Sequence, residues 1–323
     1  MQAGYSVEIS SDMTGDGMAD IVVGTPSFDE MHGYIVDGQS SGDNDLLSSS
    51  AVLVGEEKQY FGTSVSTAGD VNNDGFEDLI TGSGMHWNLE GAQITFGPVE
   101  GEVQLETSGV SFESGVDAWS QFGWSVGGLG DFNGDGIDDV FVSAPTALES
   151  KGMVYIFAGP FQSGSLLGTE DAFVTVEGAH GYSTGIVDWD GCYEGYAVSA
   201  AGDINRDGLA DVLIGAPYQS YDGAESNLGT AQVVYGRTEP EELDYFSADI
   251  VFRLQSYTAP APMAGYAVSA GDIDNDGYQD VVVGSHWWGQ AFLFFGPLDE
   301  VEFLWNADVI ITSSMNDQTI ALT

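Results

Sequence analysis

Short apolar runs that end at glycine or proline recur along the chain and set the expected secondary structure. Five of them read "DIVVGTP", "DLITGSG", "DVFVSAP", "DVLIGAP" and "DVVVGSH". Apolar runs of roughly four to eight residues bounded by turn residues are typical of strands buried on both faces. No segment sustains the periodicity of an amphipathic helix. The pattern predicts an all-β protein.

Each buried run belongs to a longer unit that occurs five times. An aromatic–glycine pair opens the unit, as in "FGTSVS" or "GYAVSA", and an acidic loop follows. Further runs such as "GMVYIFAGP" and "ADIVFRL" complete it. The loops begin at Asp12, Asp70, Asp131, Asp203 and Asp272, at intervals of 58, 61, 72 and 69 residues. Four short strands in each unit indicate the four-stranded blades of a β-propeller.

The five units fill the chain, with approximate bounds 4–54, 61–112, 122–177, 195–254 and 265–313. We expect a single propeller domain over residues 1–323. A five-bladed ring is favoured, because joining Thr323 to Met1 gives an interval of 63 residues between the last loop and the first. The alternative is five consecutive blades of a longer array.

The net charge of the chain limits the classes of partner that it is expected to bind. Lys and Arg number 5 against 51 Asp and Glu, a formal net charge of −46. Such a surface repels nucleic acid and anionic membranes and attracts cations. Direct membrane insertion is not expected, because no apolar run approaches the roughly 18 residues of a transmembrane helix. "MQAGYSVEIS" lacks the features of a signal peptide.

The acidic loops have the composition of calcium sites. Counting from the first Asp, oxygen-bearing side chains stand at positions 1, 3, 5 and 9, glycine at 6, and a backbone carbonyl is available at 7. Position 12 carries no carboxylate, so these are strand–loop–strand sites and not EF-hands. The alternative is a solvated, Asp-rich turn that binds no ion. We expect about five structural calcium ions, one for each loop. The candidate ligands are Asp12, Thr14, Asp16, Met18, Asp20, Asp70, Asn72, Asp74, Phe76, Asp78, Asp131, Asn133, Asp135, Ile137, Asp139, Asp203, Asn205, Asp207, Leu209, Asp211, Asp272, Asp274, Asp276, Tyr278 and Asp280.

Histidines and aromatic residues gather in the other set of loops, which join second to third strands and one blade to the next. Rigid rings with polar tips suit a recognition surface. The alternatives are structural filling, a histidine–metal cluster, or catalysis by Cys192, the single cysteine. The candidates are His32, His86, Trp87, Trp119, His180, Trp189, Tyr193, Tyr218, Tyr221, His286, Trp287 and Trp288.

The aromatic–glycine pair, the D-x-N-x-D-G-x-x-D loop and the Gly-Ala-Pro ending resemble the FG-GAP repeats of integrin α-subunit propellers. The resemblance covers essentially the whole chain, although that family's ring usually has seven blades. It implies an extracellular, calcium-stiffened propeller used for adhesion, with the partner on the face opposite the calcium loops.

These features together favour an extracellular or cell-surface recognition module that binds a protein or a glycan. A monomer is favoured, and the chain is not expected to be an enzyme. A lectin-like propeller would need similar aromatic pockets in every blade, whereas the aromatic loops here are unequal. A propeller hydrolase or lyase is the third alternative, but the calcium loops already account for the conspicuous acids.

Overall fold

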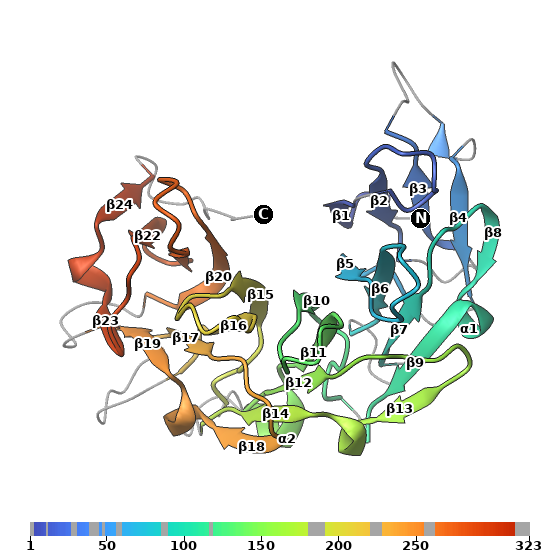
Figure 1. Ribbon diagram of the computed structural model, residues 1–323. Coiled ribbons are helices and arrows are strands. Elements are labelled where there is room, and N and C mark those ends of the chain that lie inside the picture. Colours follow the sequence, from blue (N-terminus) through green and yellow to red (C-terminus); the bar gives the residue numbers. More distant parts are fainter. Residues whose placement is uncertain are drawn as a thin grey trace. The chain divides into compact units, whose positions relative to one another are not determined.

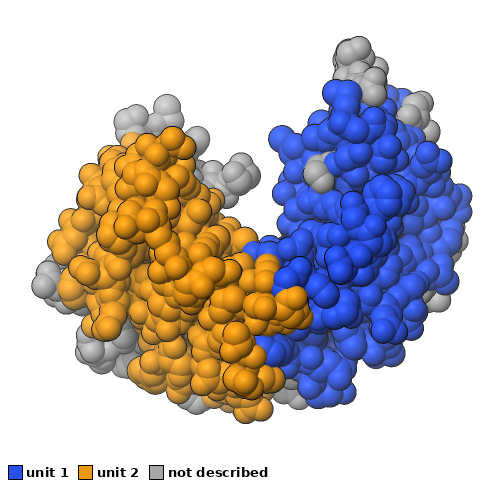
Figure 2. Space-filling model, viewed as in Figure 1, with its two compact units in different colours: residues 1–130, 136–143, 155–173 blue, residues 131–135, 144–154, 174–323 orange. Residues whose placement is uncertain are grey.

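A computed structural model describes residues 3–10, 12–26, 31–38, 45–46, 49–55, 60–84, 90–115, 119–179, 191–219, 228–254 and 262–313. These residues form five sheets of antiparallel hairpins (Figure 1), which confirms the all-β prediction. The chain divides into two compact units (Figure 2). Unit 1 comprises residues 1–130, 136–143 and 155–173, and unit 2 comprises residues 131–135, 144–154 and 174–323.

Unit 1 contains the sheets of the first two repeats. The first holds β1 (Ser6–Ile9), β2 (Ile21–Gly24), β3 (Met31–Val36) and β4 (Ala51–Val54) in chain order. The second holds β5 (Ser64–Gly69), β6 (Asp78–Gly82), β7 (Gly91–Thr95) and β9 (Gly109–Glu113). Both sheets have the expected four-strand meander.

Unit 2 contains the sheets of the last two repeats. One holds β15 (Ala197–Gly202), β16 (Asp211–Ala216), β17 (Thr230–Val234) and β19 (Ile250–Arg253). The other holds β20 (Ala264–Gly271), β21 (Asp280–Ser285), β22 (Gln290–Phe294) and β24 (Val309–Thr312). The second and third strands are almost wholly buried, which explains their unbroken apolar runs.

The boundary between the units falls within the third repeat. Its first strand, β10 (Val126–Gly130), pairs antiparallel with β11 (Asp139–Ala144). The helical turn α2 (Ala147–Ser150) and then β12 (Met153–Phe157) and β14 (Val174–Glu177) follow along the chain.

Each repeat from the second onward contains one more strand than the sequence predicts. The extra strands are β8 (Gly101–Gln104), β13 (Leu166–Gly168), β18 (Glu241–Asp244) and β23 (Val301–Phe303). Each pairs in parallel with the fourth strand of the preceding repeat: β8 with β4, β13 with β9, β18 with β14, and β23 with β19. Consecutive repeats are therefore also joined by backbone hydrogen bonds at their outer edges.

A single helical turn follows each extra strand and leads the chain into the fourth strand of its own repeat. These turns are α1 (Leu105–Ser108), η2 (Thr169–Asp171), η3 (Tyr245–Ser247) and η4 (Leu304–Asn306). Within the ranges given above, no helix is long and apolar enough to cross a membrane.

Apolar side chains pack between consecutive sheets to form the core of each unit. In unit 1, Leu53 of the first repeat lies in one buried cluster with Val65 and Leu79 of the second. In unit 2, the rings of Phe252 and Phe294 have their centroids 5.0 Å apart. The sheets therefore stack face to face, as blades do.

The two glycines of the repeated motif meet where consecutive sheets are closest. A methyl group on Gly215, at the end of β16, would collide with the carbonyl oxygen of Gly265 in the next repeat. Gly82 stands in the same relation to Gly123. The glycine of the aromatic–glycine pair has a positive φ, 81° at Gly265 and 89° at Gly123. Both glycines of the motif are therefore required, one by space and one by backbone conformation.

Gly215→Ala tests this contact, and Gly284→Ala is the matched control. Gly284 is the equivalent residue of the last repeat, and its added methyl would lie 3.2 Å from the carbonyl oxygen of Ala267. We expect Gly215→Ala to lower the free energy of unfolding by about 1–3 kcal/mol, because backbone must move. Gly284→Ala should cost less, and equal losses in urea unfolding would contradict this account.

Candidate functional site

The acidic loops join the first strand to the second in each repeat, as the sequence predicts. In the fourth loop, Oδ1 of Asp203 accepts a hydrogen bond from the N–H of Asp207 at 3.0 Å. Its Oδ2 accepts from the N–H of Gly208 at 2.9 Å. Oδ1 of Asp207 accepts from the N–H of Leu209 at 2.9 Å. Asp12, Asp70 and Asp272 accept the same pair of hydrogen bonds in their own loops.

The backbone of these loops is left-handed at two positions. Position 6 is always glycine, with φ between 85° and 92° at Gly17, Gly75, Gly136, Gly208 and Gly277. At position 4 the chain also adopts a positive φ, which is 63° at Arg206 and 61° at Asn275. These turns curl the loop so that the side chains at positions 1, 3 and 5 converge.

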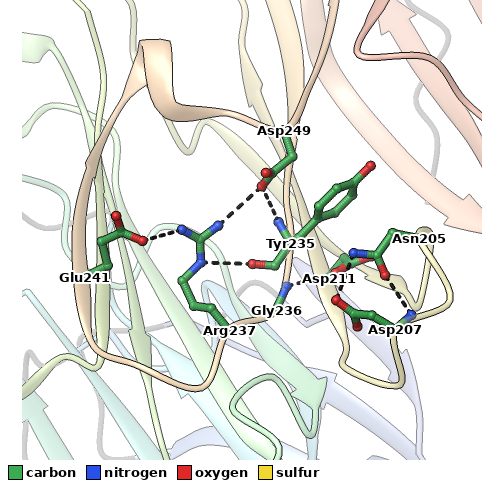
Figure 3. Close-up of polar contacts among 8 residues, drawn as sticks. All are labelled: Asn205, Asp207, Asp211, Tyr235, Gly236, Arg237, Glu241 and Asp249. Atoms are coloured by element: carbon green, nitrogen blue, oxygen red, sulfur yellow. Dashed lines mark hydrogen bonds and ion pairs between the residues drawn. The ribbon is translucent and has the colours of Figure 1, made fainter.

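The Asp at position 9 is buried in all five repeats, at Asp20, Asp78, Asp139, Asp211 and Asp280. Oδ2 of Asp211 accepts from the N–H of Ile204 at 2.7 Å, and Oδ1 accepts from the N–H of Gly236 at 2.9 Å. Gly236 follows β17, so this carboxylate connects the loop to the backbone just after the C-terminal end of the third strand (Figure 3). Burial raises the pKa of Asp211 to about 7, against the opposing effect of these two N–H groups.

The position-9 carboxylate therefore has a structural role that the sequence does not show. Its expected second role, as a calcium ligand, stays a prediction.

The fifth loop brings three carboxylates together. Ligand oxygens of Asp272, Asp274 and Asp276 lie within 4.8 Å of one another. The second to fourth loops carry Asn at position 3, so an amide oxygen replaces one carboxylate there. Asn205 Oδ1 accepts from the N–H of Asp207 at 2.9 Å, which places it over the same turn. Carboxylate and amide oxygens arranged in this way fit a hard cation such as calcium.

Arginine links the fourth loop to its surroundings. The guanidinium of Arg206 lies over the ring of Tyr278, 3.4 Å from its centroid, and donates to the carbonyl of Gly277 in the fifth loop. On the segment after β17, Arg237 forms ion pairs with Glu241 at 2.6 Å and with Asp249 at 3.3 Å (Figure 3). In unit 2, two acidic loops are thus connected through one cationic side chain.

A continuous row of aromatic rings lies at the other end of the strands in unit 2. We call it the aromatic row. Neighbouring ring centroids are separated by 4.9, 6.4, 4.8, 4.5 and 5.8 Å along the series Tyr193, Tyr218, Tyr196, Tyr266, His286 and Trp287. The hydroxyl of Tyr196 donates to that of Tyr266 at 2.9 Å. Trp287 is 67% exposed, so the row ends at the surface.

Strand direction places this row opposite the acidic loops. β15 runs toward the fourth loop, and Tyr196 precedes it, whereas β16 runs away from that loop, and Tyr218 follows it. Four residues of the row, namely Tyr193, Tyr218, His286 and Trp287, are candidates that the sequence predicts. Tyr196 and Tyr266 are missed, although both stand in "GYAV", directly after the glycine of the repeated motif.

The remaining candidates for the recognition face are placed differently. His32 lies within strand β3, so the expectation that every histidine lies in a loop is wrong. Trp119 is exposed in unit 1, and Trp288 stacks on Trp305 and packs against the core of unit 2. Five further candidates lie outside the described residues: His86, Trp87, His180, Trp189 and Tyr221.

A buried acid in unit 2 is a second feature that the sequence does not indicate. Glu194 is fully buried, and its Oε1 accepts from Nε2 of Gln232 at 2.5 Å. Oε2 of Glu194 and Oε1 of Gln232 are both buried, and neither accepts a hydrogen bond from any residue that the structure describes. Burial raises the pKa of Glu194 to about 8. A carboxyl with this pKa is protonated at pH 7 and carries an O–H that can donate a hydrogen bond.

Cys192 lies beside this acid and is not a nucleophile in this setting. Its buried Sγ lies 2.8 Å from the carbonyl oxygens of Lys151 and of Ala179, so its single S–H can donate to either of them. Burial, followed by the charge of Glu194, raises the pKa of the thiol well above its usual value. The thiolate that nucleophilic chemistry requires is therefore disfavoured.

Comparison with known proteins identifies the repeats. A family model described as "FG-GAP repeat" matches residues 61–86, 122–157, 195–234 and 264–294. The match does not include the first repeat, whose strands β1–β4 nevertheless form the same kind of sheet.

Full-length relatives carry the name integrin alpha. Integrin alpha pat-2 of Caenorhabditis elegans is 31% identical over 254 residues, which cover 74% of this chain and 20% of that protein. Integrin alpha-V of Gallus gallus is 30% identical over 219 residues, 66% and 20% of the two chains. The chain spans about a fifth of the length of these curated relatives.

Stacked four-stranded sheets, paired glycines and acidic hairpin loops define this protein as a β-propeller chain. Its repeats are FG-GAP repeats, and the chain belongs with the integrin α-like propellers.

The buried acid predicts a pH dependence of stability. In the folded state Glu194 holds its proton up to about pH 8, whereas the pKa of a glutamate in water is 4.5. The stabilising contribution is complete below pH 4.5 and is lost as the pH rises to about 8. We expect Glu194→Gln, measured by urea unfolding, to remove a slope of about 1.4 kcal/mol per pH unit over this window. The exposed-acid control Glu242→Gln should keep the slope, and an unchanged slope in Glu194→Gln would refute the assignment.

Proposed function

We propose that this chain is an extracellular recognition and adhesion module that binds a protein partner through the aromatic row of unit 2. The observation that carries the proposal is the unbroken series of six rings across the fourth and fifth repeats. Similarity to integrin α chains supports it, because the proposed surface lies at the strand ends opposite the acidic loops.

The row has the properties of a binding surface. Tyr196 and Tyr266 are half-buried and hold one another through their hydroxyls, so little side-chain entropy remains to be lost when a partner binds. Trp287 presents a large exposed ring beside them, in edge contact with His286. Aromatic side chains of this kind dominate the binding energy of many protein interfaces.

A protein partner is favoured over a glycan because the row is asymmetric. It runs across two repeats as one patch, whereas a lectin-like propeller would repeat one pocket in every blade. Glycan binding remains the second candidate, since the exposed Trp287 could also stack on a sugar ring.

In this proposal the acidic loops hold calcium as a structural ion. In the fifth loop, Asp272, Asp274 and Asp276 would supply oxygens, and equivalent residues would do so in the other loops. Bound calcium would offset the repulsion among these carboxylates and add its binding free energy to folding. Extracellular calcium, which is abundant, suits such sites and agrees with a location outside the cell or at its surface.

The recognition surface is tested by Trp287→Ala, with Trp305→Ala as a matched control that removes another exposed tryptophan. The purified chain is applied in calcium buffer to arrays of extracellular proteins and of oligosaccharides. We expect protein binding that Trp287→Ala weakens about 30-fold, the cost of a hot-spot residue, and that Trp305→Ala leaves unchanged. Equal losses would contradict the assignment of the surface, and capture on oligosaccharides alone would favour the lectin.

The calcium loops are tested by Asp207→Ala. In calcium, the variant should melt well below the wild type, because it loses a charged ligand. In chelator, the loss of stability should shrink to that of the two hydrogen bonds that Asp207 accepts, from the N–H of Leu209 and from Nδ2 of Asn205, about 1–2 kcal/mol in total. Asp299→Ala, an exposed acid outside the loops, is the control and should change neither melting temperature. Equal losses of the Asp207→Ala variant in calcium and in chelator would contradict a cation site.

A further inference from the structure

A pocket of about 210 Å³ lies within unit 1, in the segment that runs from the end of β12 through β13 (Figure 1). Its lining includes three apolar and three polar residues, namely Phe157, Phe161, Leu167, Gln162, Ser165 and Asp171. Gln162 and Asp171 are exposed, so the pocket opens to solvent. None of its lining residues belongs to an acidic loop or to the aromatic row.

The space is explained by Ala158, which also lines the pocket. Ala158 directly follows the third strand of its repeat, and the residue in the same place is Phe96 in the second repeat, Tyr235 in the fourth and Phe295 in the fifth. Five residues, 161–165, then lead from the proline to β13, whereas two lead from the corresponding proline to β8 and three to β23. The third repeat therefore lacks one aromatic ring and has a longer connection around the vacant place.

The walls of the pocket are fixed by the core of unit 1. The rings of Phe157 and Phe161 pack on Phe112 of β9, with centroids 4.8 and 5.8 Å from its own. The N–H of Phe161 donates to the carbonyl oxygen of Val71 at 3.0 Å, and β13 pairs in parallel with β9. The space is thus formed before a ligand binds, which lowers the entropic cost of binding.

Charge decides which kind of ligand suits this pocket. Oδ2 of Asp171 accepts from the N–H of Gly168 at 2.9 Å, which occupies one of the roughly four acceptor sites of a carboxylate. The described residues of unit 1 contain no lysine or arginine that could pair with Asp171. A carboxylate beside apolar walls attracts a cationic ligand, and the net charge of −46 repels an anionic one.

We propose that this pocket binds a small organic cation that carries an aromatic ring and an ammonium group. The ring would occupy the place of the missing aromatic side chain, against Phe161 and Leu167, and the ammonium group would pair with Asp171. A pocket of about 210 Å³ suits such a ligand, because an apolar cavity of about 150 Å³ is large enough to bind benzene. It is smaller than the roughly 300–1,000 Å³ of sites that take drug-sized ligands.

The test measures the dissociation constant of phenethylammonium by NMR titration of the full chain. Salt at about 0.15 M screens the general attraction of an acidic surface for cations. We expect saturable binding to the wild type. Ala158→Phe restores the ring that three other repeats carry, so it should abolish binding and leave the melting temperature unchanged or higher. Asp171→Asn keeps an oxygen for the N–H of Gly168 and should weaken binding about 10-fold, through the loss of a charged hydrogen bond.

Glu170→Gln is the matched control, because it removes the same charge from the neighbouring exposed residue, which does not line the pocket. It should leave the dissociation constant nearly unchanged, and neutral phenethyl alcohol should bind the wild type more weakly than the amine does. Phenylalaninamide presents the same two groups as the N-terminus of a peptide, so its affinity relative to phenethylammonium distinguishes a peptide from a free amine. The proposal is overturned if neither amine binds, if Ala158→Phe binds as the wild type does, or if Asp171→Asn and Glu170→Gln weaken binding equally.

Discussion

Each repeat contains a buried aspartate at position 9 of its acidic loop, and in the second, fourth and fifth repeats its carboxylate accepts two backbone hydrogen bonds. Asp211 fixes the N–H of Ile204 at the start of the loop and the N–H of Gly236 beyond the third strand. A carboxylate is costly to bury unless its oxygens are hydrogen-bonded, and two backbone donors would be orphaned without it. One side chain thus sets the hairpin, the loop and the end of the third strand. Asp78 and Asp280 make the same pair of contacts in their repeats.

The exposed carboxylates earlier in the loop are distinct from this buried one. Asp203 and Asp207 also fold their loop by accepting backbone N–H groups, and in the fifth loop the carboxylates of Asp272, Asp274 and Asp276 lie within 4.8 Å of one another. With a net charge of −46 on the chain, such crowding opposes folding unless a cation is shared. The buried aspartate defines the turn, and the exposed ones make it a place where calcium would add stability. A stiff loop at one end of the strands would then steady the aromatic row at the other.

Local rules made the strands and loops predictable. The loop itself requires glycine at position 6 and aspartate at positions 1, 5 and 9. The motif "DINRDGLAD" is therefore sufficient to predict the loop. The extra strand β18, "EELD", is short and polar, and becomes a strand because β14 of the preceding repeat pairs with it. Tyr196 and Tyr266 are separated by 70 positions, and their contact follows only from the stacking of two sheets. The burial of Glu194 could not be predicted from a local motif, because its contact with Gln232 depends on how distant segments of the chain pack together.

The most direct test of this account is to count the ions that the loops hold. Native mass spectrometry of the chain from calcium-containing buffer, repeated after chelation, measures that number. The account predicts about five calcium ions for each chain, one for each acidic loop, lost on chelation. A chain that carries no calcium in the calcium-containing buffer would contradict it, and the loops would then be acidic turns held by their own hydrogen bonds.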